Sequence, residues 1–256
     1  MTEQKTALIT AGGSGIGLQM AHHFVANGYE VAITDIDTAA LNRTEQALPS
    51  VICMHADAAN EDHMRAVELE LDNRWANLDV VMANAGIAGP TSYIEDIKLD
   101  DWKHCIAVNL DGAFLICRYA ARRMKRQNSG VITLTSSTAG LFGYPCRSPY
   151  AAAKWGIIGL MKTLAMELGP SGVRVNAICP GAVDGDRMDR VIANEARARG
   201  LSEESLRAGY AECVSLRQFV NAEDIADMAV FLASDKAKSI SGMAMAVDGH
   251  TEQVTL

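Results

Sequence analysis

The sequence lacks the features that mark membrane, metal-binding and nucleic-acid-binding proteins. It has no stretch near the roughly 18 uncharged apolar residues of a membrane helix, and its opening residues 1–5 do not have the form of a signal peptide. Its six cysteines include no CxxC pair and its six histidines show no metal-ligand spacing, so we expect free thiols in a reducing compartment and no metal site. Basic residues number 23 against 31 acidic ones, which argues against a nucleic-acid surface and favours a cytoplasmic protein.

What is present is the composition of an ordinary globular protein. Apolar residues make up 49% of the 256 positions and charged residues 21%. A chain of this length hides roughly 70% of its surface on folding, so a core can form without metal or disulfide support. We find no linker, repeat or low-complexity segment, and we therefore expect one domain over residues 1–256.

Short β-branched runs alternate with segments of helical spacing along most of the chain. The runs are apolar throughout, which is typical of parallel strands covered on both faces. The pattern therefore predicts an α/β fold, a doubly wound parallel sheet of about seven strands with helices on both faces. The expected strands are 6–10, 31–34, 51–54, 78–82, 131–135, 173–178 and 243–247. The expected helices are 15–27, 39–47, 60–75, 102–127, 151–168 and 222–233.

One charged segment, residues 182–216, interrupts this alternation. It contains no strand signal and follows the strand expected at 173–178. Because ligands bind beyond the carboxyl ends of parallel strands, a helical insertion there would cover the binding site. We therefore expect a helical substrate lid.

A glycine-rich turn, residues 10–17 (TAGGSGIG), joins the first expected strand to the first expected helix. Glycines let the backbone turn tightly and approach a pyrophosphate, whose charge is then stabilised by the helix N-terminus. Asp35 ends the second expected strand, where a carboxylate accepts hydrogen bonds from an adenosine ribose and repels a 2′-phosphate. This position favours NAD over NADP; the alternative is that Asp35 only caps the following helix.

Tyr150 and Lys154 lie four residues apart at the start of an expected helix, so their side chains share one face. A free tyrosine has a pKa near ~10, and a neighbouring ammonium together with an oxidised nicotinamide would stabilise the phenolate. Lowering that pKa by about three units needs about 4 kcal/mol, which two close cations in a partly desolvated pocket can supply. Ser137 follows the strand expected at 131–135, where its hydroxyl could hold a substrate oxygen. By itself, a tyrosine–lysine pair at this spacing is also common on solvated helix faces.

The helix expected at 102–127 contains two residues that are unfavourable in a helix interior. They are Asn109 and, three residues further on, Gly112. Because a local rule is broken there, we expect a functional kink.

Together these motifs resemble the short-chain dehydrogenase/reductase family in its single-domain form, and the resemblance covers nearly the whole chain. It implies a Rossmann-type fold and hydride transfer between a nicotinamide dinucleotide and a secondary alcohol or ketone. The matching positions are the turn at 10–17, Asp57, Asn84-Ala85-Gly86, Asn109, Ser137, Tyr150 with Lys154, Pro180-Gly181 and 247–249.

The resemblance also implies a role for each matching residue. Tyr150 would be the acid/base, and Lys154 would lower its pKa and bind the nicotinamide ribose. Ser137 would orient the substrate oxygen, and Asn109 would hold a water that relays protons. Besides Tyr150 and Lys154, the residues implied to bind the cofactor are Gly12, Ser14, Gly15, Ile16, Asp35, Ile36, Asp57, Ala58, Asn84, Ala85, Gly86, Pro180, Gly181 and Val183.

The sequence departs from the family pattern in three places. Ala11 stands where members usually carry glycine, and we expect Gly12 and Gly13 to supply the tight turn instead. Ala83 replaces the first asparagine of the usual Asn-Asn-Ala-Gly. The segment 184–186 (DGD) lacks the threonine that usually follows Pro-Gly, which removes a hydrogen bond to the nicotinamide carboxamide.

The substrate is expected at loops of the same sheet edge, with Thr138, Arg147 and Arg187 as candidate contacts. We hypothesise that one arginine, Arg147, Arg187 or Arg190, pairs with a substrate carboxylate. The alternative is that the lid arginines pair on a solvated surface with neighbouring acidic residues, Asp186, Asp189 and Glu195.

We therefore expect an NAD-dependent oxidoreductase that interconverts a secondary alcohol and a ketone, on a small polar substrate such as a hydroxy acid, sugar acid or polyol. The alternatives are an NADPH-dependent biosynthetic ketoreductase, against which Asp35 argues, and a dinucleotide-sensing protein without catalysis. Segments 102–127 and 151–168 carry apolar residues on more than one face, and in the resembling family they form the dimer face. We expect a homotetramer, or at least a homodimer, with no nucleic-acid or membrane partner.

Overall fold

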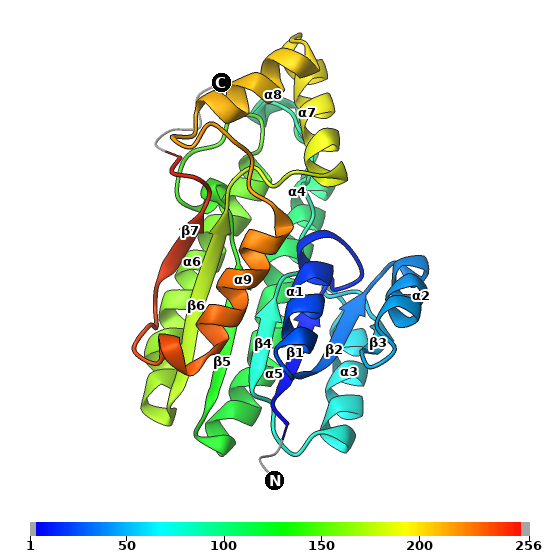
Figure 1. The fold of residues 1–256 in the computed structure, drawn as a ribbon. Helices are drawn as coiled ribbons and strands as arrows, with labels where there is room; N and C mark the ends of the chain where they lie inside the picture. Colours follow the sequence, from blue (N-terminus) through cyan, green and yellow to red (C-terminus); the bar gives the residue numbers. More distant parts are fainter. Residues whose placement is uncertain (1–3, 252–256) are drawn as a thin grey trace.

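Seven parallel strands form one sheet through the middle of the molecule (Figure 1). The computed structural model describes residues 4–251; residues 1–3 and 252–256 lie outside the described part. The strand order β3-β2-β1-β4-β5-β6-β7 reverses direction between β1 and β4, which confirms the predicted doubly wound sheet. The strands are β1 (Thr6–Thr10), β2 (Glu30–Asp35), β3 (Ile52–His55), β4 (Val80–Ala83), β5 (Gly130–Thr135), β6 (Val173–Pro180) and β7 (Ala244–Val247).

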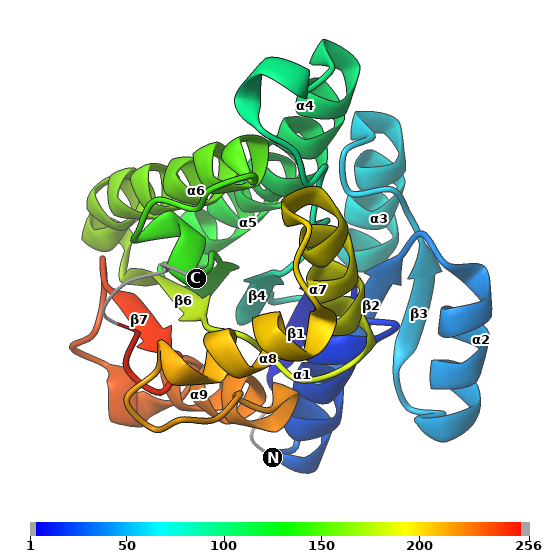
Figure 2. The same cartoon turned by 90° about the horizontal axis from the view of Figure 1, so that it is seen from above.

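Helices cover both faces of this sheet because successive strand residues point to opposite sides. In β1, Leu8 faces a core shared with helices α3, α5 and α6, whereas Ile9 faces a core shared with α1, α2 and α9. Figure 2 shows α1 and α9 on one side of the sheet and α5 and α6 on the other. The helices around the sheet are α1 (Gly15–Ala26), α2 (Thr38–Ala47), α3 (Glu61–Arg74), α4 (Leu99–Ile106), α5 (Gly112–Gln127), α6 (Ser148–Leu168) and α9 (Ala222–Ala233).

The single helix predicted at 102–127 is interrupted. α4 and α5 are joined by a π-helical turn, Ala107–Asp111, with Asn109 at its centre. A π turn widens the helix by one residue and is frequent at functional sites. The helix is therefore irregular at the predicted position, in the form of a π-helical turn around Asn109.

The charged segment after β6 folds into two helices, α7 (Asp186–Arg199) and α8 (Glu203–Glu212), which lie over the carboxyl ends of the strands (Figure 1). They have a small core of their own, in which Ile192 and Leu206 pack with Ala88 and Tyr144 from the loops below. The expected helical segment above the sheet edge is thus present.

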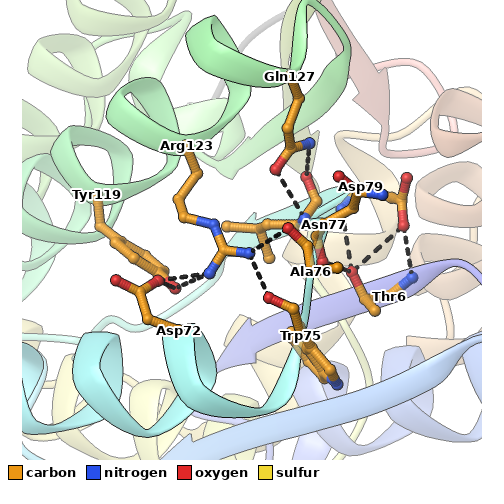
Figure 3. Close-up of polar contacts among 10 residues, drawn as sticks. Thr6, Asp72, Trp75, Ala76, Asn77, Asp79, Tyr119, Arg123 and Gln127 are labelled. Carbon is orange, nitrogen blue, oxygen red and sulfur yellow. Dashed lines mark hydrogen bonds and ion pairs between the residues drawn. The ribbon is translucent and has the colours of Figure 1, made fainter.

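The opposite, amino edge of the sheet is closed by a polar network around Arg123 (Figure 3). The Arg123 guanidinium donates to the carbonyls of Trp75 (2.6 Å) and Ala76 (3.0 Å) and pairs with Asp72. Its central carbon lies 6.0 Å from the centre of the Tyr119 ring. These contacts join the end of α3 to α5, so Arg123 satisfies carbonyls that a helix end leaves without partners. Within residues 4–251, no helix is long and apolar enough to cross a membrane.

Candidate active site

The glycine-rich turn at the carboxyl end of β1 is packed against its neighbours. A side chain at Gly12 would come within 2.5 Å of the Ile33 Cβ, and one at Gly17 would overlap the Ala11 carbonyl. The Gly12 amide donates to the Thr34 carbonyl at 2.9 Å. Gly12 and Gly17 therefore allow this close packing, and α1 begins at Gly15 with Ser14 as its N-cap.

Ala11 itself adopts a left-handed conformation, with φ +52°, and Gly15 has φ +50°. Neither Gly12 nor Gly13 has positive φ. The expectation that these two glycines supply the turn is therefore wrong: Ala11 supplies it, at a cost of about 1 kcal/mol for a residue with a Cβ.

Asp35 lies at the end of β2 with its carboxylate against the glycine-rich turn. One oxygen accepts from the Gly13 amide at 2.9 Å and the other from the Asp37 amide at 3.0 Å. The cap of α2 is Asp37, which accepts from the Ala40 amide at 3.1 Å. Asp37 therefore caps α2. Asp35 does not cap it and faces the glycine-rich turn, beside the exposed Ile36.

Asp57 and Ala58 lie at the end of the next strand, β3. The Asp57 carboxylate accepts from the Ala59 amide at 2.9 Å, and its own amide donates to His63 Nδ1 at 3.2 Å. The Ala58 backbone packs against Gly112 at the start of α5, where a side chain on Gly112 would come within 3.2 Å of the Ala58 carbonyl. Asp35 and Asp57 therefore follow neighbouring strands at the same edge.

Asn84 joins the ends of three strands. Its amide nitrogen donates to the Thr10 carbonyl at 3.1 Å, and its carbonyl oxygen accepts from the Thr135 hydroxyl at 3.0 Å. The Thr10 hydroxyl in turn accepts from the backbone amides of Asn84 and Ala85, both at 2.9 Å. Sequence reasoning missed Thr10 and Thr135, because a threonine that ends a buried strand carries no signal beyond its β propensity.

The segment after β6, residues 180–183, is fixed to the end of β7. The Gly181 amide donates to the Val247 carbonyl at 3.0 Å, and a side chain at Gly181 would come within 2.8 Å of the Asp248 Cβ. Val183 pairs with Val220. Pro180, Gly181 and Val183 therefore lie at the same carboxyl edge as the glycine-rich turn.

Ser137, Tyr150 and Lys154 come together beside β5. Lys154 is only 2% exposed, and its ammonium donates to the Thr135 carbonyl at 2.8 Å. The Ser136 hydroxyl donates to the backbone carbonyl of Lys154 at 2.9 Å. The Lys154 Nζ lies 5.6 Å from the centre of the Tyr150 ring, and the Ser137 hydroxyl hydrogen bonds to Tyr150. The tyrosine–lysine pair is therefore part of a packed site and not of a solvated helix face.

The charges around Tyr150 favour its phenolate. Burial alone would raise the pKa of Tyr150, but Lys154, Arg187, Arg147 and the bond from Ser137 outweigh it, so the pKa lies below its usual 10.0. Burial lowers the pKa of Lys154, and the attraction to Tyr150 opposes that change. The site thus combines a phenol whose pKa is lowered with an ammonium held close to it.

Asn109 faces Lys154 across the Gly86 backbone. Its amide nitrogen donates to the carbonyls of Cys105 (2.9 Å) and Ile87 (3.1 Å), whereas its buried Oδ1 has no hydrogen-bond partner among residues 4–251. A side chain at Gly86 would come within 2.6 Å of this oxygen and 3.3 Å of the Lys154 Nζ. A buried acceptor without a partner is costly, and this oxygen is able to accept a further hydrogen bond.

Two arginines approach the loop after β4 without forming an ion pair in the described part of the chain. Arg187, at the exposed start of α7, donates to the Gly86 carbonyl at 3.1 Å; the buried Arg147 donates to the Ala88 carbonyl at 2.9 Å. Thr138 is buried in the short turn that follows Ser137.

The alternative pairing of the lid charges is only partly realised. Asp184 and Asp189 pair with Arg207, and Glu195 pairs with Arg199, so two of the three expected carboxylates have partners other than Arg187 or Arg190. No ion pair of Asp186 occurs within the described ranges.

The residues present fit a dinucleotide. Gly12, Gly17 and Gly86 let the backbone pack closely at the carboxyl edge, where a side chain would overlap Ile33, Ala11 and Asn109 respectively. Asp35 lies at the end of β2 against the glycine-rich turn, and the Tyr150–Lys154 pair lies beside the end of β5. No group of histidine, cysteine, aspartate and glutamate residues within 4–251 could hold a metal ion.

Comparison with known proteins gives a consistent picture. A family profile described as Enoyl-(Acyl carrier protein) reductase matches residues 10–250. The chain is 34% identical over 252 residues to D-beta-hydroxybutyrate dehydrogenase of Rhizobium meliloti (strain 1021), covering 96% of this chain and 97% of that protein. It is 33% identical to 3-oxoacyl-(acyl-carrier-protein) reductase FabG of Staphylococcus aureus (strain Mu50 / ATCC 700699), covering 97% and 98%. The crystal structure of NAD+-bound xylitol dehydrogenase superposes with a TM-score of 0.92 at 26% identity, covering 96% and 98%.

Proposed function

The chain belongs to the short-chain dehydrogenase/reductase family, a family of oxidoreductases, and on that basis we propose that it interconverts a secondary alcohol and a ketone with NAD. The observation that carries the proposal is the meeting of Ser137, Tyr150 and Lys154 at the carboxyl edge of the sheet, with the pKa of Tyr150 lowered. NAD, when bound, would accept or supply the hydride. The chain itself would bind the substrate, hold its oxygen and move its proton.

The dinucleotide would lie along the carboxyl edge. Its pyrophosphate would meet the glycine-rich turn and the start of α1, at Gly12, Ser14, Gly15 and Ile16. Its adenosine would lie between Asp35 and Asp57, and its nicotinamide ribose would meet Lys154 and the segments after β4 and β6. The Asp35 carboxylate, fixed by two backbone amides, supports NAD over NADP because a 2′-phosphate there would meet a negative charge.

In the oxidation direction, the Tyr150 phenolate would take the proton of the substrate hydroxyl while Ser137 holds the same oxygen. The proton would then leave through the Lys154 ammonium and a water at the free Oδ1 of Asn109. In the reduction direction, the neutral phenol would return the proton. Lys154 would therefore have three tasks: to favour the phenolate, to hold the ribose and to pass on the proton.

A small polar substrate, such as a hydroxy acid, sugar acid or polyol, fits the charges of the site. Arg187 faces the loop beside Tyr150 and has no ion pair within residues 4–251, which supports a carboxylate as its partner. One relative is named for D-beta-hydroxybutyrate and one neighbour for xylitol, a hydroxy acid and a polyol. Thr138 and Arg147 border the same space.

A homotetramer in the cytoplasm completes the proposal. Phe114 on α5 and Trp155 on α6 are 46% and 50% exposed, which favours burial of these two helices against a second copy. Cys53, Cys105, Cys117, Cys146 and Cys179 are free thiols, the state typical of a reducing compartment. The mass of the protein in solution, measured by light scattering, tests the tetramer.

The first test is a substrate panel. Secondary alcohols, polyols and hydroxy acids are supplied with NAD or NADP, and NADH or NADPH formation is followed by absorbance. We expect NADH from one class only, and its loss in Tyr150→Phe. Activity with NADP alone would favour the biosynthetic ketoreductase, and NADH binding by fluorescence without any turnover would favour the sensing protein.

Arg187→Ala tests the substrate class, with Arg187→Lys as the variant that keeps the charge. For an acidic substrate we expect KM to rise about tenfold or more in Arg187→Ala, with an unchanged Kd for NADH. A raised Kd for NADH with an unchanged KM would instead assign Arg187 to the cofactor.

A further inference from the structure

Arg147 is a buried cation beside the reacting phenol. Only 4% of its surface is exposed, and its guanidinium carbon lies 4.7 Å from the centre of the Tyr150 ring and 5.5 Å from that of Tyr144. The preceding residue, Cys146, adopts the left-handed conformation with φ +61°, which turns the chain just before Arg147 enters α6. Such strain is costly for a residue with a Cβ and is concentrated at functional sites.

The protein leaves this cation poorly satisfied. One guanidinium nitrogen donates to the Ala88 carbonyl at 2.9 Å, while Nε is buried without a hydrogen-bond partner in residues 4–251. No carboxylate within the described residues forms an ion pair with Arg147. A buried charge normally requires a partner of opposite sign, because its desolvation is otherwise not compensated.

The anion that meets this requirement is the Tyr150 phenolate. Ionisation spreads negative charge into the ring, so a cation held over its face attracts the phenolate far more than the neutral phenol. We propose that Arg147 is a positioning residue of the reaction. It acts through Tyr150, whose phenolate form it stabilises from the face of the ring. The proposal rests on the function proposed above, in which Tyr150 exchanges the proton.

Other groups face Tyr150 from each element packed against it, and they set the background for this effect. Lys154 lies below it on α6, Arg187 lies on α7, and Ser137 follows β5. Tyr144, on the loop before α6, bonds to Tyr210 of α8, which donates to the Glu195 carboxylate at 2.6 Å. Glu195 is paired with Arg199, so its negative charge is compensated away from Arg147.

The test compares neutral and charged replacements of Arg147. Arg147→Gln removes the charge and keeps a donor for Ala88, whereas Arg147→Met removes the charge and fills the apolar space between the two rings. Arg147→Lys keeps the charge, and Arg122→Gln removes an exposed charge on α5 as the control. Either neutral variant suffices, so one that fails to fold does not end the test.

Two readouts are measured on the full chain. The first is the pH profile of kcat/KM for oxidation of the best alcohol of the panel with NAD. The second is the near-ultraviolet titration of the Tyr150 phenol, taken as the difference from the matching variant that also carries Tyr150→Phe.

Without the positive charge of Arg147, the Tyr150 phenolate is less stable, so the phenol keeps its proton up to a higher pH. In Arg147→Gln and Arg147→Met, we expect the acid limb of the profile and the phenol titration to move up by about one pH unit. On the acid limb this shift equals a tenfold loss of rate. Lys and the Arg122→Gln control are expected to stay close to the wild type. An unmoved titration in a folded neutral variant would overturn the proposal, as would an equal shift in the control. Absence of turnover in the whole panel would instead count against the proposed function, since the phenol titration needs no substrate.

Discussion

Arg123 and Arg147 are two buried arginines at opposite edges of the same sheet, each lying over a tyrosine ring. Arg123 has the Asp72 carboxylate and the carbonyls of Trp75 and Ala76 as partners (Figure 3). Arg147 has one carbonyl and a buried nitrogen without a partner in the described chain. The buried arginine at the amino edge thus has an ion pair and several hydrogen bonds, whereas the one at the carboxyl edge has a single side-chain hydrogen bond and no ion pair within residues 4–251.

The difference separates stability from function. A satisfied buried charge fixes the geometry of the elements that it joins, here α3 and α5. A buried charge without partners lowers stability unless a bound group or an ionised neighbouring side chain compensates it. Within residues 4–251, three groups near Tyr150 lack such completion: Arg147 and Arg187 form no ion pair, and the buried Oδ1 of Asn109 has no hydrogen-bond partner.

The largest effect is expected from Arg123→Met. Two carbonyls at the end of α3 lose their donor, and Asp72 loses its ion-pair partner and keeps only the bond from Tyr119. We expect the free energy of unfolding to fall by about 3 kcal/mol, measured by denaturant titration, with unchanged kcat in the folded fraction.

Arg147→Met is the matched control for that loss. It removes one hydrogen bond and a desolvated charge, whose effects oppose each other, so the free energy of unfolding should change by less than about 1 kcal/mol. An equal loss in both variants would erase the distinction between the two edges.

The tyrosines beneath the two arginines give a second matched pair. Tyr119 donates to Asp72 at 2.9 Å, and Tyr119→Phe should lower the free energy of unfolding by about 1.5 kcal/mol without changing KM. Tyr144→Phe breaks the contact to Tyr210 that ties the loop before α6 to the lid, and we expect it to raise KM as well. A change in KM for Tyr119→Phe, or none for Tyr144→Phe, would contradict this division.

The smallest effect concerns backbone strain at the two edges. Ala11 beside the site and Asn128 after α5 both have positive φ, +52° and +56°. Ala11→Gly relieves the steric cost of a Cβ but adds chain entropy, and should stabilise by about 0.5 kcal/mol in thermal denaturation. Asn128→Gly should give no gain, because asparagine tolerates this conformation; a gain as large as that of Ala11→Gly would refute the comparison.

Sequence patterns predicted the layers of the fold because these depend on local periodicity. The apolar run at 6–10 matches β1, and the helix expected at 222–233 matches α9, residue for residue. Asn109 was detectable since asparagine and a nearby glycine are unfavourable in a helix. Ala11 was misjudged because the choice of which residue turns left-handed depends on packing of Gly12 against Ile33.

The two arginines could not be told apart from the sequence. Each lies within four positions of a tyrosine, and each is followed by a helix or lies in one. Their difference comes from residues 48 to 59 positions away, which only the fold brings near: Asp72 and Trp75 for Arg123, and Ala88 for Arg147. The bond from Tyr144 to Tyr210 likewise depends on where the lid lies.

The most direct test is the pKa of the Tyr150 phenol in the wild-type protein, measured as the difference between its ultraviolet titration and that of Tyr150→Phe. Cations at the carboxyl edge stabilise the phenolate, so we expect ionisation clearly below the ordinary value of 10.0. Stabilisation of the phenolate would also make the native protein gain stability relative to Tyr150→Phe as pH rises from that lowered pKa toward 10.0. A phenol that ionises at or above 10.0 would show that burial outweighs the cations, and would contradict both the acid/base role of Tyr150 and the purpose assigned to Arg147.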